Sequence, residues 1–220
     1  MPEKRNVLLV EGTSDFGLVR NLWKLHNPGD DPFEIEVKFG LNNLREAFSG
    51  FLLASDVARL GVIADADVGV EKRWPGFYQT LRTRGYARVP PKLPPDGLVL
   101  EEPDAGVCVV GVWLMPDNSA PGGLEEMVRR MVHSDDQLWL HADTVLNEIP
   151  GNLVKFKSTH RSKAHVHTWL AWQEEPGMRI GPAVTRGVLN ANAPEALRLM
   201  EWLRQVFVSA GAEPPLTRPS

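Results

Sequence analysis

The chain has 220 residues, of which 43% are apolar and 24% are charged, and its formal net charge is −4 at pH 7. This length suits one domain with an elaboration, and the composition is that of a folded globular protein. The net charge excludes a surface that is basic throughout, although a local basic patch remains compatible with it. One cysteine, Cys108, excludes an internal disulfide, and its apolar neighbours predict that it is buried. No apolar run reaches the ~18 residues of a membrane span, so we expect a cytoplasmic protein without membrane association.

The first half of the sequence alternates strand and helix patterns. Strands are predicted from continuous or alternating apolar runs at Asn6–Val10, Phe33–Phe39, Leu60–Ala64, Leu98–Leu100 and Gly106–Met115. Helices are predicted from apolar residues at helical spacing, from Ser14 or Asp15 to about His26, from Asn42 or Asn43 to about Ser55, over about Val70–Arg84, and from Leu124 to about Val132. This order predicts an α/β fold with a mostly parallel central sheet and helices on both faces.

The rest of the sequence is predicted to be mainly helical. Helices are expected over Asp136–Ile149 and His160–Trp172, and from Asn192, with Glu195 at the spacing of a capping box, to about Val208. We therefore expect a core over residues 1–134 and a mainly helical C-terminal elaboration over residues 135–210 that packs on it. Residues 211–220, with three prolines, are expected to form a flexible tail.

Three carboxylates follow two of the buried strands. Glu11 comes directly after the first strand, and Asp65 and Asp67 leave a later strand as Asp-x-Asp. Ligand sites of parallel sheets form at the carboxyl ends of the strands, and residues i and i+2 of an extended chain point the same way. Hard cations such as Mg²⁺ and Mn²⁺ prefer carboxylate and water oxygens. An isolated Asp-x-Asp pair often only caps a helix or forms a turn, so the combination of both strand ends predicts the metal site.

The residues VLLVEGTSD (Val7–Asp15) and LGVIADAD (Leu60–Asp67) resemble the Toprim domain of topoisomerases, primases, ribosomal-RNA maturases and OLD-family nucleases, and the resemblance covers about Asn6–Arg130. ADADVGVEKRW (Ala64–Trp74) and LMPDNSAPGGLEEMV (Leu114–Val128) are similar to small standalone Toprim-like proteins related to the OLD nucleases. The resemblance implies a Rossmann-like Toprim fold. Within it, Glu11 matches the catalytic glutamate, Asp65 and Asp67 match the metal-binding pair, and Asp15 matches an acidic companion that we place with the substrate-binding residues.

The OLD-like group also implies a further acid after the next strand and a downstream lysine. We assign the acid to Glu125, with Glu126 as the alternative, although acids in a first helical turn need no other role than the helix dipole. We assign the lysine to Lys163, which lies in a basic run from Lys155 to His167. Lys157 and Arg161 of that run are assigned to phosphate binding, with a solvated basic face as the alternative. Asp117 is assigned either to the substrate or to the turn in which it lies.

Together these features predict hydrolysis of nucleic-acid phosphodiester bonds that depends on Mg²⁺ or Mn²⁺, with Glu11 and Lys163 as catalytic residues. The alternative is a non-catalytic module that binds a nucleotide or nucleic acid through metal. Such a module would act with a partner protein such as a separate ATPase, because OLD-type nucleases carry an ATPase domain and this sequence has no Walker loop. DNA and RNA, endonuclease and exonuclease, and one or two metal ions all stay open at this point.

Overall fold

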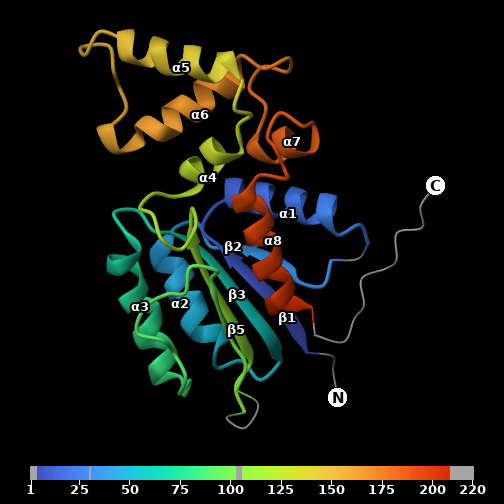
Figure 1. Ribbon diagram of the computed structural model, residues 1–220. Coiled ribbons are helices and arrows are strands. Elements are labelled where there is room, and N and C mark those ends of the chain that lie inside the picture. The colour runs from blue at the N-terminus through green and yellow to red at the C-terminus, as the bar shows by residue number, and fades with distance from the viewer. Residues whose placement is uncertain (1–3, 30, 103–105, 209–220) are drawn as a thin grey trace, which may run out of the picture.

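The computed structural model describes residues 4–29, 31–102 and 106–208, and the predicted tail lies outside them. It contains a mixed α/β fold around one five-stranded, mostly parallel sheet with the order β2-β1-β3-β5-β4 (Figure 1). The strands are β1 (Arg5–Val10), β2 (Glu34–Val37), β3 (Val57–Asp65), β4 (Leu98–Leu100) and β5 (Val109–Met115). The first three and β5 run parallel, and β4 pairs antiparallel with β5. The predicted fold class is confirmed at this level.

Helices cover both faces of the sheet because alternate side chains of its buried strands enter two separate cores. Leu8 and Val10 of β1 belong to the core under α1 (Thr13–His26) and α8 (Pro194–Phe207). Val7 and Leu9 belong to the core under α2 (Leu41–Phe51) and α3 (Val70–Thr83). This alternation is the period of two that an extended chain imposes, and it is why continuous apolar runs predicted these strands.

The connections create a topological switch point between β1 and β3. The chain leaves β1 through α1 to reach β2 on one side, and returns through α2 to β3 on the other side of β1. Crossover loops at such a point diverge and leave a crevice at the carboxyl ends of the two strands. Glu11 and Asp65 therefore lie on either side of the switch point.

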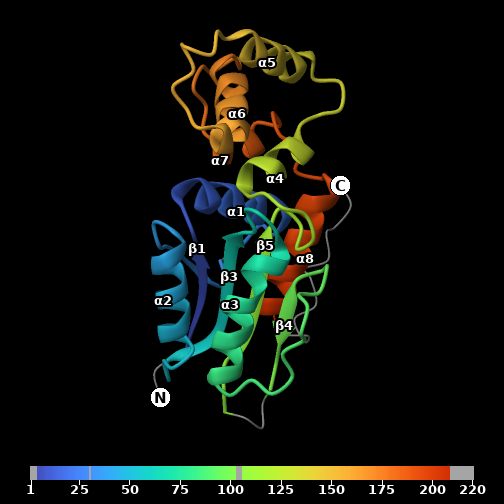
Figure 2. The same ribbon diagram turned by 90° about the vertical axis from the view of Figure 1, so that its left-hand side faces the viewer.

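The helices after β5 gather over this carboxyl edge. Figures 1 and 2 show α4 (Leu124–Met131) directly above the strand ends, and α5 (Gln137–Glu148) and α6 (Arg161–Ala171) farther out. A short 3-10 turn (Ser158–His160) leads into α6, and α7 (Ile180–Thr185) then leads to α8. The chain then returns to the sheet in α8. This helix packs so closely on β5 that a Cβ at Gly111 would lie 2.4 Å from Val206.

The structure corrects several predicted helix starts. The capping box predicted at Asn192 and Glu195 is wrong, because α8 begins at Pro194 after Ala193 and has no side-chain cap. The helices α1 and α2 begin after Gly12 and Gly40, before the predicted residues, whereas α3 and α4 begin at Val70 and Leu124 as predicted. The helix α7 was not predicted at all.

Two expectations from composition can also be compared with the structure. Cys108 was predicted to be buried, but it is only partly buried, and its Sγ lies 3.3 Å from the hydroxyl of Tyr86. None of the helices in the described part of the chain combines the length and the apolar character that crossing a bilayer requires.

Candidate metal centre

Two strand ends bring Glu11 and Asp65 into contact. The backbone N–H of Asp65 donates to Glu11 Oε2 at 3.4 Å, across the switch point between β1 and β3. The Glu11 carboxylate also interacts with the backbone N–H of Leu41 at the start of α2. Parallel pairing of β1 with β3, in which Val10 lies opposite Ile63, places the two side chains at the same edge. The Glu11 carboxylate is therefore held by two backbone N–H groups, that of Asp65 at the end of β3 and that of Leu41 at the start of α2.

The Asp65 carboxylate points at the N-terminus of α4. The N–H of Leu124 donates to Asp65 Oδ1 at 3.1 Å, an arrangement that the dipole of a helix N-terminus favours for an anion. Gly123 makes this approach possible, because a Cβ there would lie 2.5 Å from the carboxyl carbon of Asp65. The glycine before α4 is therefore required by the position of the acid.

Asp67 is held in a left-handed backbone conformation with φ of 50°. Its N–H and C=O form a pair of hydrogen bonds with Gly122, of 2.8 and 2.7 Å, that ties this loop to the segment before α4. Arg73, on α3, donates through Nη2 to Asp67 Oδ2 and through Nε to the backbone carbonyl of Asp65 at 2.9 Å. The guanidinium of Arg73 thus balances part of the negative charge of the loop.

Two further acids complete the cluster. Asp15 is buried in the first turn of α1, where its Oδ2 accepts the N–H of Gly12 at 2.9 Å. Glu125, in the first turn of α4, lies with Oε1 3.3 Å from Nζ of Lys163 on α6. The residues assigned as the further acid and the downstream lysine are therefore in contact, although 38 positions separate them in the sequence.

The carboxylates are close enough to perturb one another. Burial, and then the charges of Asp15, Glu11, Glu125 and Asp67, raise the pKa of Asp65 to about 8. Burial and the charges of Glu11 and Glu125 raise the pKa of Asp15 to about 6, against the hydrogen bond from Gly12. Burial also raises the pKa of Glu11, with Asp67 adding to the effect. Clustered acids that shift in this direction lack enough positive charge around them.

A cleft of about 790 Å³ opens beside these acids. Its walls come from the loop between β3 and α3, the N-terminus of α4 and the start of α6, and its polar lining includes Asp65, Asp67, Arg73, Glu125 and Lys163. Thr159, His160 and Ser162 also line it. The cleft thus has an acidic wall at the sheet and a partly basic wall on α6.

The donor set fits a hard divalent cation, with a rearrangement. Carboxylate oxygens are the ligands that Mg²⁺ and Mn²⁺ prefer, and an added cation would offset the repulsion that raises these pKa values. Within residues 4–29, 31–102 and 106–208, however, no three Asp, Glu, His or Cys side chains already converge as a finished ligand group. The oxygens of Asp67 and Glu125 are instead engaged with Arg73 and Lys163. These two side chains would have to turn away for the carboxylates to share a metal ion.

Three residues assigned to substrate binding lie elsewhere. Asp117 accepts hydrogen bonds from the N–H groups of Ser119 and Ala120 and contacts Arg130. Burial would raise the pKa of Asp117, but these hydrogen bonds outweigh it and lower that pKa, as expected for a turn carboxylate. Arg161 donates to Asp143 at 2.9 Å and lines a neighbouring pocket with Glu125, and neither it nor the exposed Lys157 lines the cleft.

Sequence reasoning did not single out Arg73. The available signal was a lone arginine one turn into the helix that follows the Asp-x-Asp loop, six positions after Asp67. That signal is weak, because a basic residue on an exposed helix is usually only solvated. Its contact with the backbone of Asp65 depends on how α3 packs on the sheet, which the local sequence does not specify.

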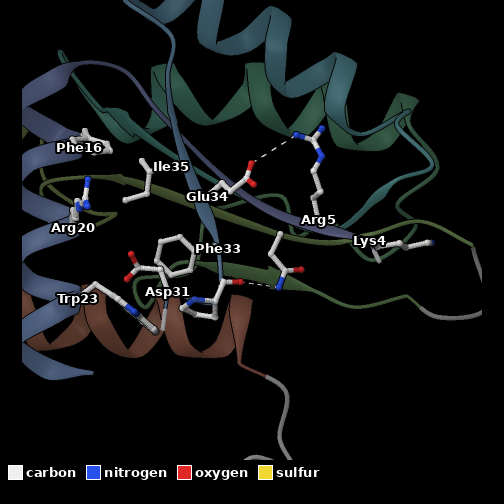
Figure 3. A pocket seen from close by; sticks show the side chains of 11 residues that line it. Lys4, Arg5, Phe16, Arg20, Trp23, Asp31, Phe33, Glu34 and Ile35 are labelled. Atoms are coloured by element: carbon white, nitrogen blue, oxygen red, sulfur yellow. Dashed lines mark hydrogen bonds and ion pairs between the residues drawn. The ribbon is translucent and has the colours of Figure 1, made fainter. Parts of the chain in front are cut away.

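A second cavity of similar size, about 750 Å³, lies along β2 (Figure 3). Its lining comes from the beginnings of β1 and β2 and from the side of α1, so it is remote from the carboxyl edge. Figure 3 shows Arg5 paired with Glu34 on one side of it, at 3.8 Å, and the aromatic side chains of Phe16, Trp23 and Phe33 on the other. It lacks a cluster of acids, and we therefore place the functional site in the cleft beside Asp65.

The two neighbouring acids of α4 are expected to respond differently to neutralisation. Glu126 Oε2 accepts the N–H of Gly123 at 2.9 Å and so caps the helix, whereas Glu125 contributes to the charge around Asp65. Glu125→Gln should weaken Mn²⁺ binding by about 10-fold, which is the lower end of the range expected when a group around a metal ion is changed. Glu126→Gln should leave Mn²⁺ binding unchanged and cost about 1 kcal/mol of stability as a weakened cap. Calorimetric titration and thermal unfolding of both variants measure this, and equal metal affinities would count against Glu125.

Comparison with known proteins yields one family. The model of the family described as "Protein of unknown function (DUF3226)" matches residues 5–208, which is nearly the whole of the described chain. The search of curated proteins and the search of solved structures each gave no match.

Proposed function

The chain belongs to the DUF3226 family, and we propose that it hydrolyses phosphodiester bonds of nucleic acid with the help of Mg²⁺ or Mn²⁺. The ions would be held by Glu11, Asp65, Asp67 and Glu125. We also propose that the α/β core is a Toprim-like domain. The order of acids at the ends of β1 and β3 supports this relationship, as does the contact between Glu125 and Lys163.

One observation carries the proposal: four acids from three separate segments surround Asp65 at a topological switch point. Burial, and then the charges of these acids, raise the pKa of Asp65 to about 8, which a purely structural role would not require. A protein gains no stability from this arrangement, because burying like charges together is costly. Such costs persist where function depends on them.

A bound divalent cation would supply charge for the phosphate and lower the pKa of a nearby water. Glu11, whose pKa is raised by burial, is suited to accept and return a proton. Its carboxylate is held by the N–H groups of Asp65 and Leu41, so the distance to a substrate phosphate would change little during the reaction.

Arg73 and Lys163 have a second role in this proposal. Here they pair with Asp67 and Glu125, which would hold the metal ion. If these carboxylates turned towards a metal ion, both basic side chains would be free to contact a phosphate in the cleft that they line. Arg73 and Lys163 would then stabilise negative charge that develops on the phosphoryl oxygens.

Cleavage by wild type and by Glu11→Gln tests the proposed function. We expect wild type to cleave at least one substrate in a panel of labelled single- and double-stranded DNA and RNA with Mg²⁺ or Mn²⁺. Glu11→Gln should lower that rate by about 10²- to 10⁴-fold, the usual contribution of a general acid or base. The control is Glu71→Gln, at an exposed acid of α3.

Two outcomes would contradict the proposal. Equal cleavage by wild type and Glu11→Gln would remove Glu11 from the chemistry. Absence of cleavage by folded wild type that binds metal would instead support the alternative, a module that binds nucleotide or nucleic acid through metal without turnover.

A further inference from the structure

Three non-glycine residues of the described chain have a left-handed backbone, and all three lie at the carboxyl edge of the sheet. They are Phe39, with φ of 54°, Asp67, with φ of 50°, and Asn118, with φ of 64°. Each comes within three residues of the end of a parallel strand, namely β2, β3 and β5. Non-glycine residues rarely adopt this conformation, and those that do gather at functional sites.

The local contacts of Asp67 and Asn118 account for their conformations. Asp67 forms its paired hydrogen bonds with Gly122. Asn118 is buried, and its Oδ1 accepts the N–H of Leu114 at 2.7 Å. Asparagine and aspartate also tolerate this backbone region better than other residues.

Phe39 is different, because it is bulky and its side chain is 76% exposed. A large apolar side chain in a strained conformation that contributes little packing has no evident structural purpose. Phe39 is the most exposed large apolar residue in the described segments, and Val68, at 69%, is second. Val68 directly follows Asp67, and Gly40, which follows Phe39, donates its N–H to the carbonyl of Glu11.

Hydrogen bonds hold the backbone on both sides of Phe39. The N–H of Lys38 donates to the carbonyl of Val10 at 2.9 Å, and the N–H of Gly40 donates to the carbonyl of Glu11 at 3.1 Å. The side-chain amide of Asn43 donates to the carbonyl of Lys38 at 3.0 Å. This turn also leads directly to Leu41, whose N–H interacts with the Glu11 carboxylate. The segment that positions Glu11 therefore also presents the Phe39 ring to solvent.

We propose that Phe39 is a substrate-positioning residue, on which a nucleobase next to the bound phosphate stacks, with Val68 as a second apolar contact. This inference rests on the proposed function, since it needs a phosphate at the acidic cluster. An aromatic ring stacks on any of the bases, because each base has a π-face. Affinity for the base would therefore be gained with little sequence preference.

Binding of ligands with and without a base tests the role of Phe39. Thymidine 5′-monophosphate, a thymidine trinucleotide and 2-deoxyribose 5-phosphate are titrated calorimetrically into the full chain in Mn²⁺. Phe39→Asn removes the ring and suits the left-handed backbone, whereas Phe39→Tyr keeps the ring. Leu53→Asn is the matched control, at an exposed apolar residue just after α2, at the far end from Glu11.

Phe39→Asn should weaken binding of a base-containing ligand by about 5- to 150-fold, the range for one base–aromatic stack. Binding of 2-deoxyribose 5-phosphate should not change, and Phe39→Tyr and Leu53→Asn should resemble wild type. A loss seen with the trinucleotide alone assigns the ring to a base within a strand, and a loss with the mononucleotide assigns it to the base of the bound phosphate. Equal losses for ligands with and without a base, or no loss, would overturn the inference. Absence of binding of all three ligands by wild type would overturn the proposed function together with it.

Discussion

Asp65→Asn is expected to abolish metal-dependent cleavage and at the same time to raise the melting temperature of the metal-free protein at pH 8.5. The loss of cleavage should exceed about 10³-fold, because metal ions contribute several kcal/mol of transition-state stabilisation. The gain in stability follows from the pKa of Asp65, which burial and four neighbouring acids raise to about 8. At pH 8.5 the aspartate is charged in the folded state at a cost that asparagine avoids, while the asparagine Oδ1 can still accept the N–H of Leu124.

The size of this stabilisation is of the order of 2–3 kcal/mol once solvent screening is allowed for, since each pKa unit corresponds to about 1.4 kcal/mol. In a chain of this size such a change raises the melting temperature by about 4–10 °C. Calorimetric unfolding in EDTA and a cleavage assay of the same preparations measure the two effects together. Lower stability with intact cleavage would identify Asp65 as a purely structural residue.

Asp117→Asn is the matched control for Asp65→Asn. Both residues follow parallel strands, but the pKa of Asp117 is lowered by its backbone and Arg130 hydrogen bonds, which outweigh the effect of burial. Neutralising Asp117 should therefore reduce stability at pH 7 and leave the cleavage rate within about 2-fold of wild type, because Asp117 does not line the cleft.

The second large effect is a fall in the stability of the metal-free protein as pH rises from about 4 to about 8. Glu11, Asp15 and Asp65 all have raised pKa values in the folded state, with those of Asp15 and Asp65 at about 6 and about 8. In this interval the folded protein binds more protons than the unfolded protein, so the free energy of unfolding decreases with pH. Above pH ~8 these groups are ionised in both states and contribute no further slope.

Mg²⁺ or Mn²⁺ should reverse this loss. At about 100 times its Kd, a ligand that binds only the folded state adds about 2.7 kcal/mol, which raises the melting temperature by about 5–10 °C. The shift should be larger at pH 8 than at pH 5, because protons compete with the metal for the carboxylates. Melting curves at several pH values, with EDTA or with metal, measure both effects.

Comparison with Asp65→Asn separates the contribution of this cluster from that of other groups in the protein. The variant should lose most of the slope between pH 6 and pH 8 and most of the metal-induced shift. A slope and a shift identical to those of wild type would show that other groups cause both.

Much of the fold and the centre of the site could be predicted from sequence because they depend on local patterns. The apolar runs before Glu11 and Asp65 are typical of strands buried on both faces, and parallel strands bring their carboxyl ends together. The contact of Glu125 with Lys163 joins distant segments, and only the resemblance to OLD-related proteins suggested it.

Other features depend on tertiary contacts that local patterns do not contain. The starts of α1 and α2 were misassigned because glycines, not Ser, Asp or Asn, precede these helices. The helix α7 has six residues, including Gly181 and Pro182, and it packs on α1, where a Cβ at Gly17 would lie 3.6 Å from Gly181. The strain at Phe39 arises from hydrogen bonds to two other segments.

Titration of Mn²⁺ into wild type and Asp65→Asn at pH 8.5, followed by electron paramagnetic resonance of the free ion, is the decisive experiment for the metal centre. We expect one or two Mn²⁺ bound per wild-type chain, at least a 100-fold loss of affinity in Asp65→Asn, and competition by Mg²⁺. Absence of binding by folded wild type, or equal binding by both proteins, would contradict a metal centre at this cluster of acids.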